Sequence, residues 1–304
     1  MAGLSLTRSR RSGQLVQALG FIAPAVITLT AVVFYPLGYS FWISLQRWSL
    51  ISGVQKWTGL NNYWAIFADP TLPTTLRVTL VYSALSVGLE ILFGLGLALL
   101  VRAGLRRRVR GFPTIRVLLM TPLLVAPLLW AFFFRSFFSP QFGLFNQVLA
   151  KIGVGPILWV NDPTIALYSL VLADVWQWTP FVFSILLAGL LAMPDDIIEA
   201  ARIDGARPRA IIWHIEIPLL RPVLLVALLM RLIDSLRYLD LVLVITQGGP
   251  GNSTEILNFL SYRISFQQMQ VGKGAAIGFV VFALVMAAAV VLLRSMWRHT
   301  HAPR

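Results

Sequence analysis

EAARIDGARPRAIIWHIEIP, residues 199–218, is a charged stretch that lies between two long apolar runs. Residues 195–196, just before it, are aspartates, and negative charge at a helix start suits the amide dipole. Gly205 predicts the end of this helix, and Pro208 suits the first turn of a second helix. Pro218 then predicts a turn back into the next apolar run. We therefore expect a helix–turn–helix that lies along a membrane surface and does not cross the membrane.

The composition places this stretch in a membrane protein. Of 304 residues, 58% are hydrophobic and only 12% are charged, fewer charges than a soluble domain of this size needs. The apolar runs are continuous and reach the roughly 20 residues that span a bilayer, whereas barrel strands alternate. The fold class expected is all-α, a polytopic membrane protein with six transmembrane helices. The expected spans are 18–46, 74–101, 116–138, 164–192, 219–246 and 274–297.

The distribution of basic residues predicts the topology. Most Lys and Arg residues fall on one side if both termini are cytoplasmic, and this places residues 193–218 in the cytoplasm. The first span is interpreted as an uncleaved signal anchor, and the basic run 105–111 as a stop signal that contacts lipid headgroups. The expected organisation is a cytoplasmic tail (1–17), a first helix with its outer loop (18–73), a transmembrane core (74–297) that includes the loop 193–218, and a second cytoplasmic tail (298–304).

Several functional classes are excluded by what the sequence lacks. It has no cysteine, which excludes disulfides, cysteine metal sites and thiol catalysis. Its histidines, His214, His299 and His301, form no zinc-type pair, so no metal site is expected. The net charge of +13 fits cytoplasmic loops better than nucleic acid. GKG at 272–274 lacks the other residues of a phosphate-binding loop, so we expect no ATP hydrolysis and no bound cofactor.

The spacing within residues 199–218 resembles a known motif. Glu-Ala-Ala is followed by three residues, Gly, nine residues and Ile-x-Ile-Pro, which is similar to the EAA motif of type I ABC importer permeases. Ile217 departs from the usual Leu, a swap that conserves volume. The resemblance implies a type I permease fold with a cytoplasmic coupling helix that docks into an ATPase subunit. The implied coupling residues are Glu199, Ala200, Ala201, Asp204, Gly205, Ile215 and Pro218.

The resemblance continues along most of the chain. The segments 35–48, 172–181, 230–240 and 246–257 (TQGGPGNSTEIL) are similar to the carbohydrate branch, to the first of its two permeases. This implies a second permease, two copies of an ATPase that bind ATP and magnesium, and an extracytoplasmic solute-binding protein. It also implies a bacterial or archaeal cytoplasmic membrane and a sugar or sugar-like solute, which the sequence does not specify further.

Charged residues recur every three positions in the fifth span, and charges within a membrane normally face a bundle interior or a water-filled path. We favour a structural ion ladder for them and keep direct solute contact as the alternative. Carboxylates, amides and aromatic rings also suit the hydroxyls and C–H faces of a sugar. The solute-pathway candidates are Asp174, Trp176, Gln177, Arg231, Asp234, Arg237, Tyr238 and Asp240.

Two other functional classes remain as alternatives. An ion-coupled secondary transporter would use Glu90, Asp174, Asp234 and Asp240, but it would predict inverted repeats and would not need a docking loop. For the isolated Glu90, a buried or hydrogen-bonded carboxyl is the interpretation that we favour. An intramembrane enzyme would need clustered acids or metal ligands, whereas these acids are spread over separate spans.

Overall fold

The computed structural model describes residues 20–106 and 109–300, so the expected terminal tails and Arg107–Arg108 lie wholly or largely outside the described residues. Among the described residues, four helices are long and apolar enough to cross a membrane. They correspond to the first, second, fourth and sixth expected spans. They are Gly20–Ser44, which includes η1 (Thr30–Phe34) and α2 (Tyr35–Ser44), then α4 (Leu72–Arg106), α8 (Ala166–Leu191) and α13 (Val271–Thr300).

The third expected span, 116–138, is not one continuous helix. It consists of α5 (Phe112–Leu119), a 3₁₀ turn η2 (Thr121–Leu124) and α6 (Pro127–Phe137). Val125 and Ala126 between them are extended, with ψ of 130° and 136°. The physical reason is Pro127, because the residue before a proline is pushed out of the α region.

The fifth expected span, 219–246, is also interrupted. Helix α11 (Ile217–Arg237) ends where Tyr238 becomes extended, with ψ of 138°, and the chain turns helical again before η4 (Val242–Thr246). Helix α11 is not among the four helices that are long and apolar enough to cross a membrane, and it carries several charges along its length. They are Arg221, Arg231, Asp234 and Arg237.

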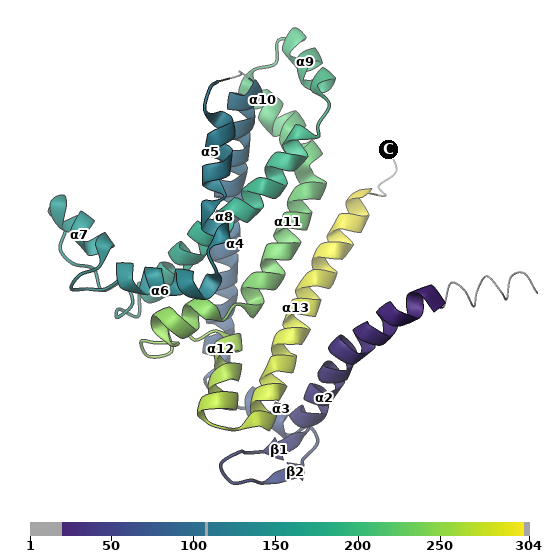
Figure 1. The fold of residues 1–304 in the computed structure, drawn as a ribbon, viewed down its shortest axis with the longest axis vertical. Coiled ribbons are helices and arrows are strands. Elements are labelled where there is room, and N and C mark those ends of the chain that lie inside the picture. The colour runs from purple at the N-terminus through teal and green to yellow at the C-terminus, as the bar shows by residue number, and fades with distance from the viewer. Residues whose placement is uncertain (1–19, 107–108, 301–304) are drawn as a thin grey trace, which may run out of the picture.

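The long helices form an elongated bundle (Figure 1). Helix α4 packs most extensively against α8, and α11 contacts both of them; α13 lies between α11 and α2. Gly94 allows the α4–α8 approach, because a Cβ there would lie 2.7 Å from Val182 Cγ1 and 3.0 Å from the Phe183 backbone nitrogen. Val182 and Phe183 belong to a hydrophobic cluster in which Leu186 of α8 and Leu220 of α11 are fully buried.

One end of the bundle is closed by a small hairpin. Strands β1 (Gln46–Trp48) and β2 (Gln55–Trp57) pair antiparallel, with Gln46 opposite Trp57. Helix α3 (Asn61–Phe67) follows, and the Asn62 side-chain amide donates 2.8 Å hydrogen bonds to the carbonyls of Ser44 and Gln46.

Helix α12 (Leu257–Tyr262) and the π-helical turn η5 (Arg263–Gln267) lie near this end (Figure 1). Helix α7 (Leu144–Lys151) projects sideways with α6.

A short polar turn precedes α4 at this hairpin end. The backbone N–H and hydroxyl of Thr71 donate to Asp69 Oδ1 at 3.0 and 2.7 Å, and Lys273 Nζ lies 3.6 Å from Asp69 Oδ2. These contacts hold the pKa of the Asp69 carboxyl below its ordinary value. The ionised carboxylate therefore fastens the start of α4 to α13.

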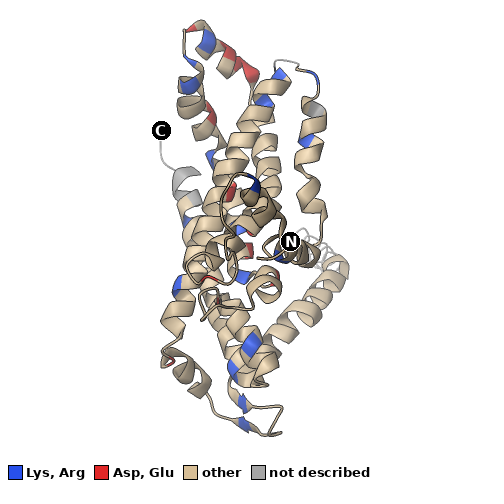
Figure 2. Cartoon of the chain, turned by 90° about the vertical axis from the view of Figure 1, so that its left-hand side faces the viewer, with Lys and Arg blue, Asp and Glu red and all other residues tan. Residues whose placement is uncertain are grey.

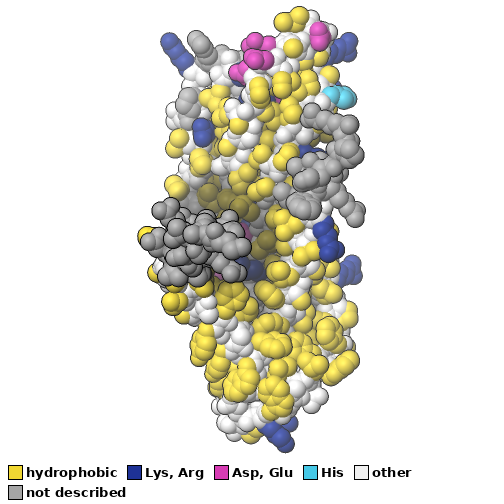
Figure 3. All heavy atoms as spheres, turned by 90° about the vertical axis from the view of Figure 1, so that its right-hand side faces the viewer, with side chains coloured by type: hydrophobic (Ala, Val, Ile, Leu, Met, Phe, Trp, Pro, Cys, Tyr) yellow, Lys and Arg dark blue, Asp and Glu magenta, His cyan; other side chains and the backbone are white. Residues whose placement is uncertain are grey.

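The opposite end carries α9 (Asp195–Ile203), which stands beyond the bundle (Figure 1). Acidic residues gather at this end together with several basic residues, whereas further basic residues lie along the bundle and at the hairpin end (Figure 2). Hydrophobic side chains cover most of the face shown in Figure 3; Phe21 is 88% exposed. An apolar surface of this extent is what a bilayer covers.

Candidate functional site

Helix α9 has the acidic first turn and the glycine end that the sequence predicted. Pro194 is its N-cap, and Asp195 and Asp196 occupy its first turn, where carboxylates are favoured. At its other end, two backbone hydrogen bonds close the helix. The Gly205 N–H donates to the carbonyl oxygen of Arg202 at 3.0 Å, and the Ala206 N–H donates to the carbonyl oxygen of Ala201 at 2.9 Å.

This pair of bonds is a Schellman motif, which places its glycine in the left-handed region. Gly205 has a φ of +78°, as the motif requires. The prediction that Gly205 caps the end of this helix is therefore confirmed.

The second helix also begins as predicted, but it does not end at Pro218. Helix α10 (Pro208–Ile211) starts with Pro208 in its first turn and passes directly through the π-helical turn η3 (Ile212–Glu216) into α11. The turn predicted at Pro218 is wrong. Pro218 is the second residue of α11 and directly follows the π-helical turn, in which the preceding Ile217 N–H bonds to Ile212 O.

Two ion pairs hold this segment to the end of α4. Arg102 Nη1 donates to Glu216 Oε1 at 2.5 Å, and both side chains are nearly inaccessible to solvent. Arg106 forms a second, more exposed ion pair with Asp195 at the start of α9. Ile198 and Ile211 supply the apolar part of the attachment, since they are 1% and 5% exposed. The segment is therefore fixed at both of its helices.

The expected coupling residues lie on this braced segment, mostly on its outside. Glu199, Ala200, Asp204, Gly205 and Pro218 are exposed, whereas Ala201 and Ile215 are partly covered. Large apolar side chains are exposed beside them: Ile203 is 85% exposed and Trp213 is 67% exposed. A rigid protruding helix with uncovered apolar groups has the properties of a protein-docking surface.

The residues that brace the segment were not predicted from the sequence. Arg102, Arg106 and Glu216 were not singled out as a group, and the run 105–111 was interpreted only as a stop signal. A signal was nevertheless present, because Glu216 is an isolated acid next to an apolar run and needs a cation when buried.

A second polar cluster lies in the interior of the bundle. Arg231 on α11 donates from Nε and Nη2 to both carboxylate oxygens of Glu90 on α4, at 2.6 and 2.7 Å. Asp174 on α8 lies 3.6 Å from the same guanidinium, and all three side chains are inaccessible to solvent. The Trp178 ring faces the Arg231 guanidinium at 4.5 Å, so the cation is enclosed on several sides.

The eight solute-pathway candidates do not share one surface. Asp174, Gln177, Arg231 and Tyr238 are buried, and the Tyr238 hydroxyl donates to Gln177 Oε1 at 2.9 Å. Trp176 is 57% exposed and stacks on Trp130. Asp234, Arg237 and Asp240 are half-buried or exposed. Arg231 pairs within its own helix only weakly, since Asp234 lies 3.9 Å away, and its main partners are on α4 and α8.

A family model and the sequences of related proteins assign this chain to the same family. Residues 90–304 match the model of the family described as binding-protein-dependent transport system inner membrane component. The trehalose/maltose transport system permease MalF of Thermococcus litoralis is 36% identical, covering 90% of this chain and 91% of the relative. The trehalose transport system permease SugA of Mycobacterium tuberculosis is 32% identical, covering 91% and 87%.

Solved structures show the same fold. A chain of a bacterial ABC transporter involved in the import of alginate superposes with a TM-score of 0.81 at 18% identity, covering 96% of this chain and 98% of that one. The family model spans more than half of the sequence and the relatives cover nearly all of it. The chain belongs to the family of inner-membrane components of binding-protein-dependent transport systems and has the fold of an ABC importer permease.

Proposed function

We propose that the chain is the transmembrane permease subunit of an ATP-driven importer for a sugar or sugar-like solute, coupled to ATPase subunits through α9. The observation that carries this proposal is the stretch formed by α9, α10 and η3, residues 195–216, which we call the α9 segment. It protrudes from one end of the bundle, carries exposed apolar groups and is braced by the Arg102–Glu216 pair. A sugar solute is supported by the printed names of the relatives, which include permeases for trehalose, maltose and sulfoquinovosyl glycerol.

The proposed assembly contains a second homologous permease, two copies of an ATPase and an extracytoplasmic solute-binding protein. One related solved complex contains a periplasmic protein with a bound alginate pentasaccharide. In this assembly the α9 end faces the cytoplasm and the hairpin end faces the binding protein. The broken third segment and α11 cross the membrane together with the four apolar helices.

The physical basis of coupling is rigidity. Helix α10 continues through η3 into α11 without a break, and α9 is tied to α4. When ATP closes the motor subunits, movement of α9 is carried as a rigid-body displacement into α4 and α11. The solute cavity then opens alternately to the two sides, and the ATP and magnesium remain on the partner subunits.

An ion-coupled secondary transporter is less well supported. Glu90 and Asp174 are enclosed around Arg231 and inaccessible to solvent, which favours a structural role for them. The relatives and solved structures give this alternative no support.

The test is affinity purification of the tagged chain in a mild detergent, combined with uptake measurements in cells. We expect a second permease and an ATPase to be recovered with the wild type. Gly205→Asp should remain in the membrane, lose the ATPase and abolish uptake. Uptake retained by Gly205→Asp would contradict the coupling role of this segment.

A further inference from the structure

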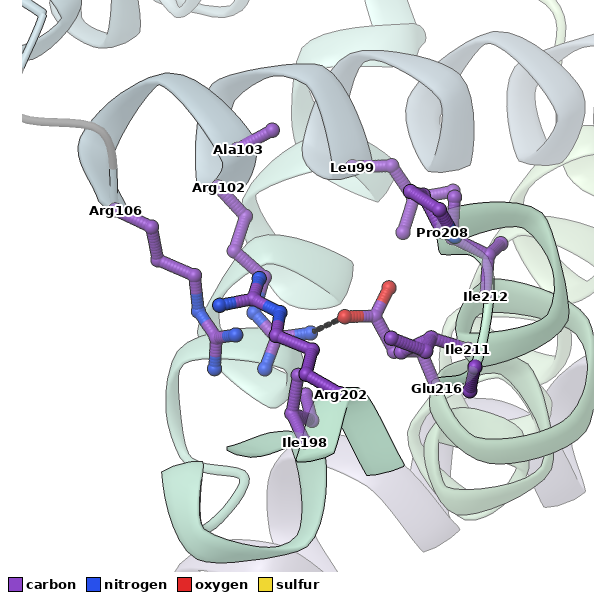
Figure 4. A pocket seen from close by; sticks show the side chains of 11 residues that line it. Leu99, Arg102, Ala103, Arg106, Ile198, Arg202, Pro208, Ile211, Ile212 and Glu216 are labelled. Carbon is purple, nitrogen blue, oxygen red and sulfur yellow. Dashed lines mark hydrogen bonds and ion pairs between the residues drawn. The ribbon is translucent and has the colours of Figure 1, made fainter. Parts of the chain in front are cut away.

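A pocket lies between the end of α4 and the α9 segment, separate from the exposed face of α9. Its volume is about 430 Å³, and α4, α9 and the α10–η3 helix all contribute to its wall. Figure 4 shows the guanidinium groups of Arg102, Arg106 and Arg202 gathered on one side and the Glu216 carboxylate facing them. The remaining wall is mainly apolar and includes Leu99 and Ile212.

The decisive observation concerns Arg102. Its side chain is only 3% exposed. Nη1 is bound to Glu216, but the buried Nη2 has no hydrogen-bond partner among the residues that the structure describes. Buried polar groups are nearly always hydrogen-bonded, and a buried cationic donor without a partner is costly.

The charges around the pocket favour an anion. The wall carries three arginines and one carboxylate, Glu216; a second carboxylate, Asp195, pairs with Arg106 at the rim. Arg202 makes no ion pair within the described part of the chain. Two cationic groups therefore retain free donors beside one another, and guanidinium forks match phosphate oxygens in two-point contacts.

We propose that this pocket is a binding site for a phosphate group, held by Arg102 Nη2 and Arg202 with Arg106 at its edge. The bound phosphate bridges α4 to the C-terminal half of α9. It therefore stiffens the connection between the two elements without occupying the exposed side of α9. A phospholipid headgroup and a free phosphate present the same oxyanion, and the experiment separates these two sources.

The experiment measures ligand binding to the purified full-length chain in detergent. One arm titrates inorganic phosphate against chloride at matched ionic strength. The other arm uses native mass spectrometry with phosphatidylglycerol, with phosphatidylcholine as the comparison lipid. Arg202→Gln is the test variant, because Arg202 is exposed and its loss leaves the Arg102–Glu216 pair intact. Arg209→Gln is the matched control, since Arg209 is exposed nearby but outside the pocket wall.

Ala103→Phe provides a second variant that fills the pocket without changing any charge, because Ala103 is part of its wall. We expect Arg202→Gln to weaken binding about tenfold, the loss of one charge-assisted hydrogen bond. Ala103→Phe should weaken it as well, and Arg209→Gln should not.

This pattern with inorganic phosphate identifies a free-phosphate site, and the same pattern with phosphatidylglycerol alone identifies a lipid site. Either result supports the proposal. Equal weakening by Arg202→Gln and Arg209→Gln, unchanged binding in Ala103→Phe, or no binding of either probe would overturn it. These outcomes do not depend on transport, so they are distinguishable from a failure of the proposed function.

Discussion

Arg231 and Glu90 form a two-point ion pair in which both side chains are completely shielded from solvent. The pair joins α11 to α4 across 141 positions of sequence. In the interior of a membrane protein, a charge persists only when it is enclosed by partners. The pair therefore fixes how the helix that continues from the α9 segment is seated in the bundle.

Breaking this pair on one side should destabilise the chain. Glu90→Met leaves a buried guanidinium with a weaker partner, and the expected loss is about 3–5 kcal/mol. It is measured as a fall in unfolding temperature of the purified chain in detergent. Asp234→Asn is the control, since Asp234 lies 3.9 Å from Arg231 and its side chain is 46% exposed.

Asp174 is buried against the same guanidinium, so recovery requires that all three charges are removed together. The triple variant Glu90→Met, Asp174→Asn and Arg231→Met should recover much of the loss, because apolar replacement of a buried ion cluster is often tolerated. A triple variant that is less stable than Glu90→Met alone would contradict this.

The close approach of α4 and α8 provides a test of packing. Gly94→Ala places a methyl group 2.7 Å from Val182 Cγ1, and overpacking of this kind costs about 1–3 kcal/mol. Gly96→Ala, two residues along the same helix, has nothing within 4 Å and should be neutral or slightly stabilising, since alanine favours helix. Thermal unfolding of both variants checks this; equal effects would contradict the α4–α8 contact.

Gly205 is constrained by its backbone and not by its surroundings. A Cβ at this position meets nothing within 4 Å, but the φ is +78°. Gly205→Val should distort the end of α9, at a cost of about 1–2 kcal/mol, and reduce the ATPase recovered with the chain. Gly205→Asn is the control, because asparagine tolerates the left-handed region. Equal recovery with Val and Asn would mean that the Schellman turn has no part in docking.

The brace between α4 and η3 should control the mobility of the α9 segment. Glu216→Gln weakens the buried bond to Arg102 and should increase amide hydrogen exchange across α9 and α10. Asp196→Asn is the comparison, since Asp196 is exposed and lies in the same segment. An increase in amide hydrogen exchange that is confined to the immediate neighbours of residue 216 would contradict a bracing role.

The turn before α4 predicts a pH effect. The pKa of Asp69 lies below its ordinary value of 3.8 because Thr71 donates two hydrogen bonds to it and Lys273 is near. Its contribution to stability is therefore complete above that value and is lost as the pH falls through the lower folded pKa. The stability difference between wild type and Asp69→Asn should stay constant from neutral pH to about 4 and shrink below it. A difference that grows on acidification would contradict this.

Features set by local chemistry were predictable from the sequence. Gly205 and Pro208 mark helix boundaries through their own backbone preferences, and both were predicted correctly. The break at Ala126–Pro127 follows from the same kind of signal, yet the apolar length of residues 116–138 outweighed it in the prediction. Pro218 was misinterpreted because a proline commonly marks a turn, whereas here the chain stays helical through the π-helical turn η3 into α11.

Features set by contacts between distant segments were not predictable in the same way. Spacing alone paired Arg231 with the acids of its own helix, whereas its close partner, Glu90, belongs to α4. The Arg102–Glu216 pair is similarly a contact between separate elements. Identifying such partners requires the three-dimensional arrangement of the helices, which periodicity in a single sequence does not supply.

The central claim is that α9 contacts the motor subunit, and site-specific cross-linking tests it most directly. The chain has no cysteine, so a single cysteine can be placed at exposed Ala200 on α9, or at Ile51 in the hairpin, which is 78% exposed. A thiol-directed photo-cross-linker is attached to each variant, and adducts in the membrane are identified. The account predicts an ATPase adduct from position 200 and none from position 51. A transport-active chain that gives no ATPase adduct from position 200, or gives one from position 51, would contradict it.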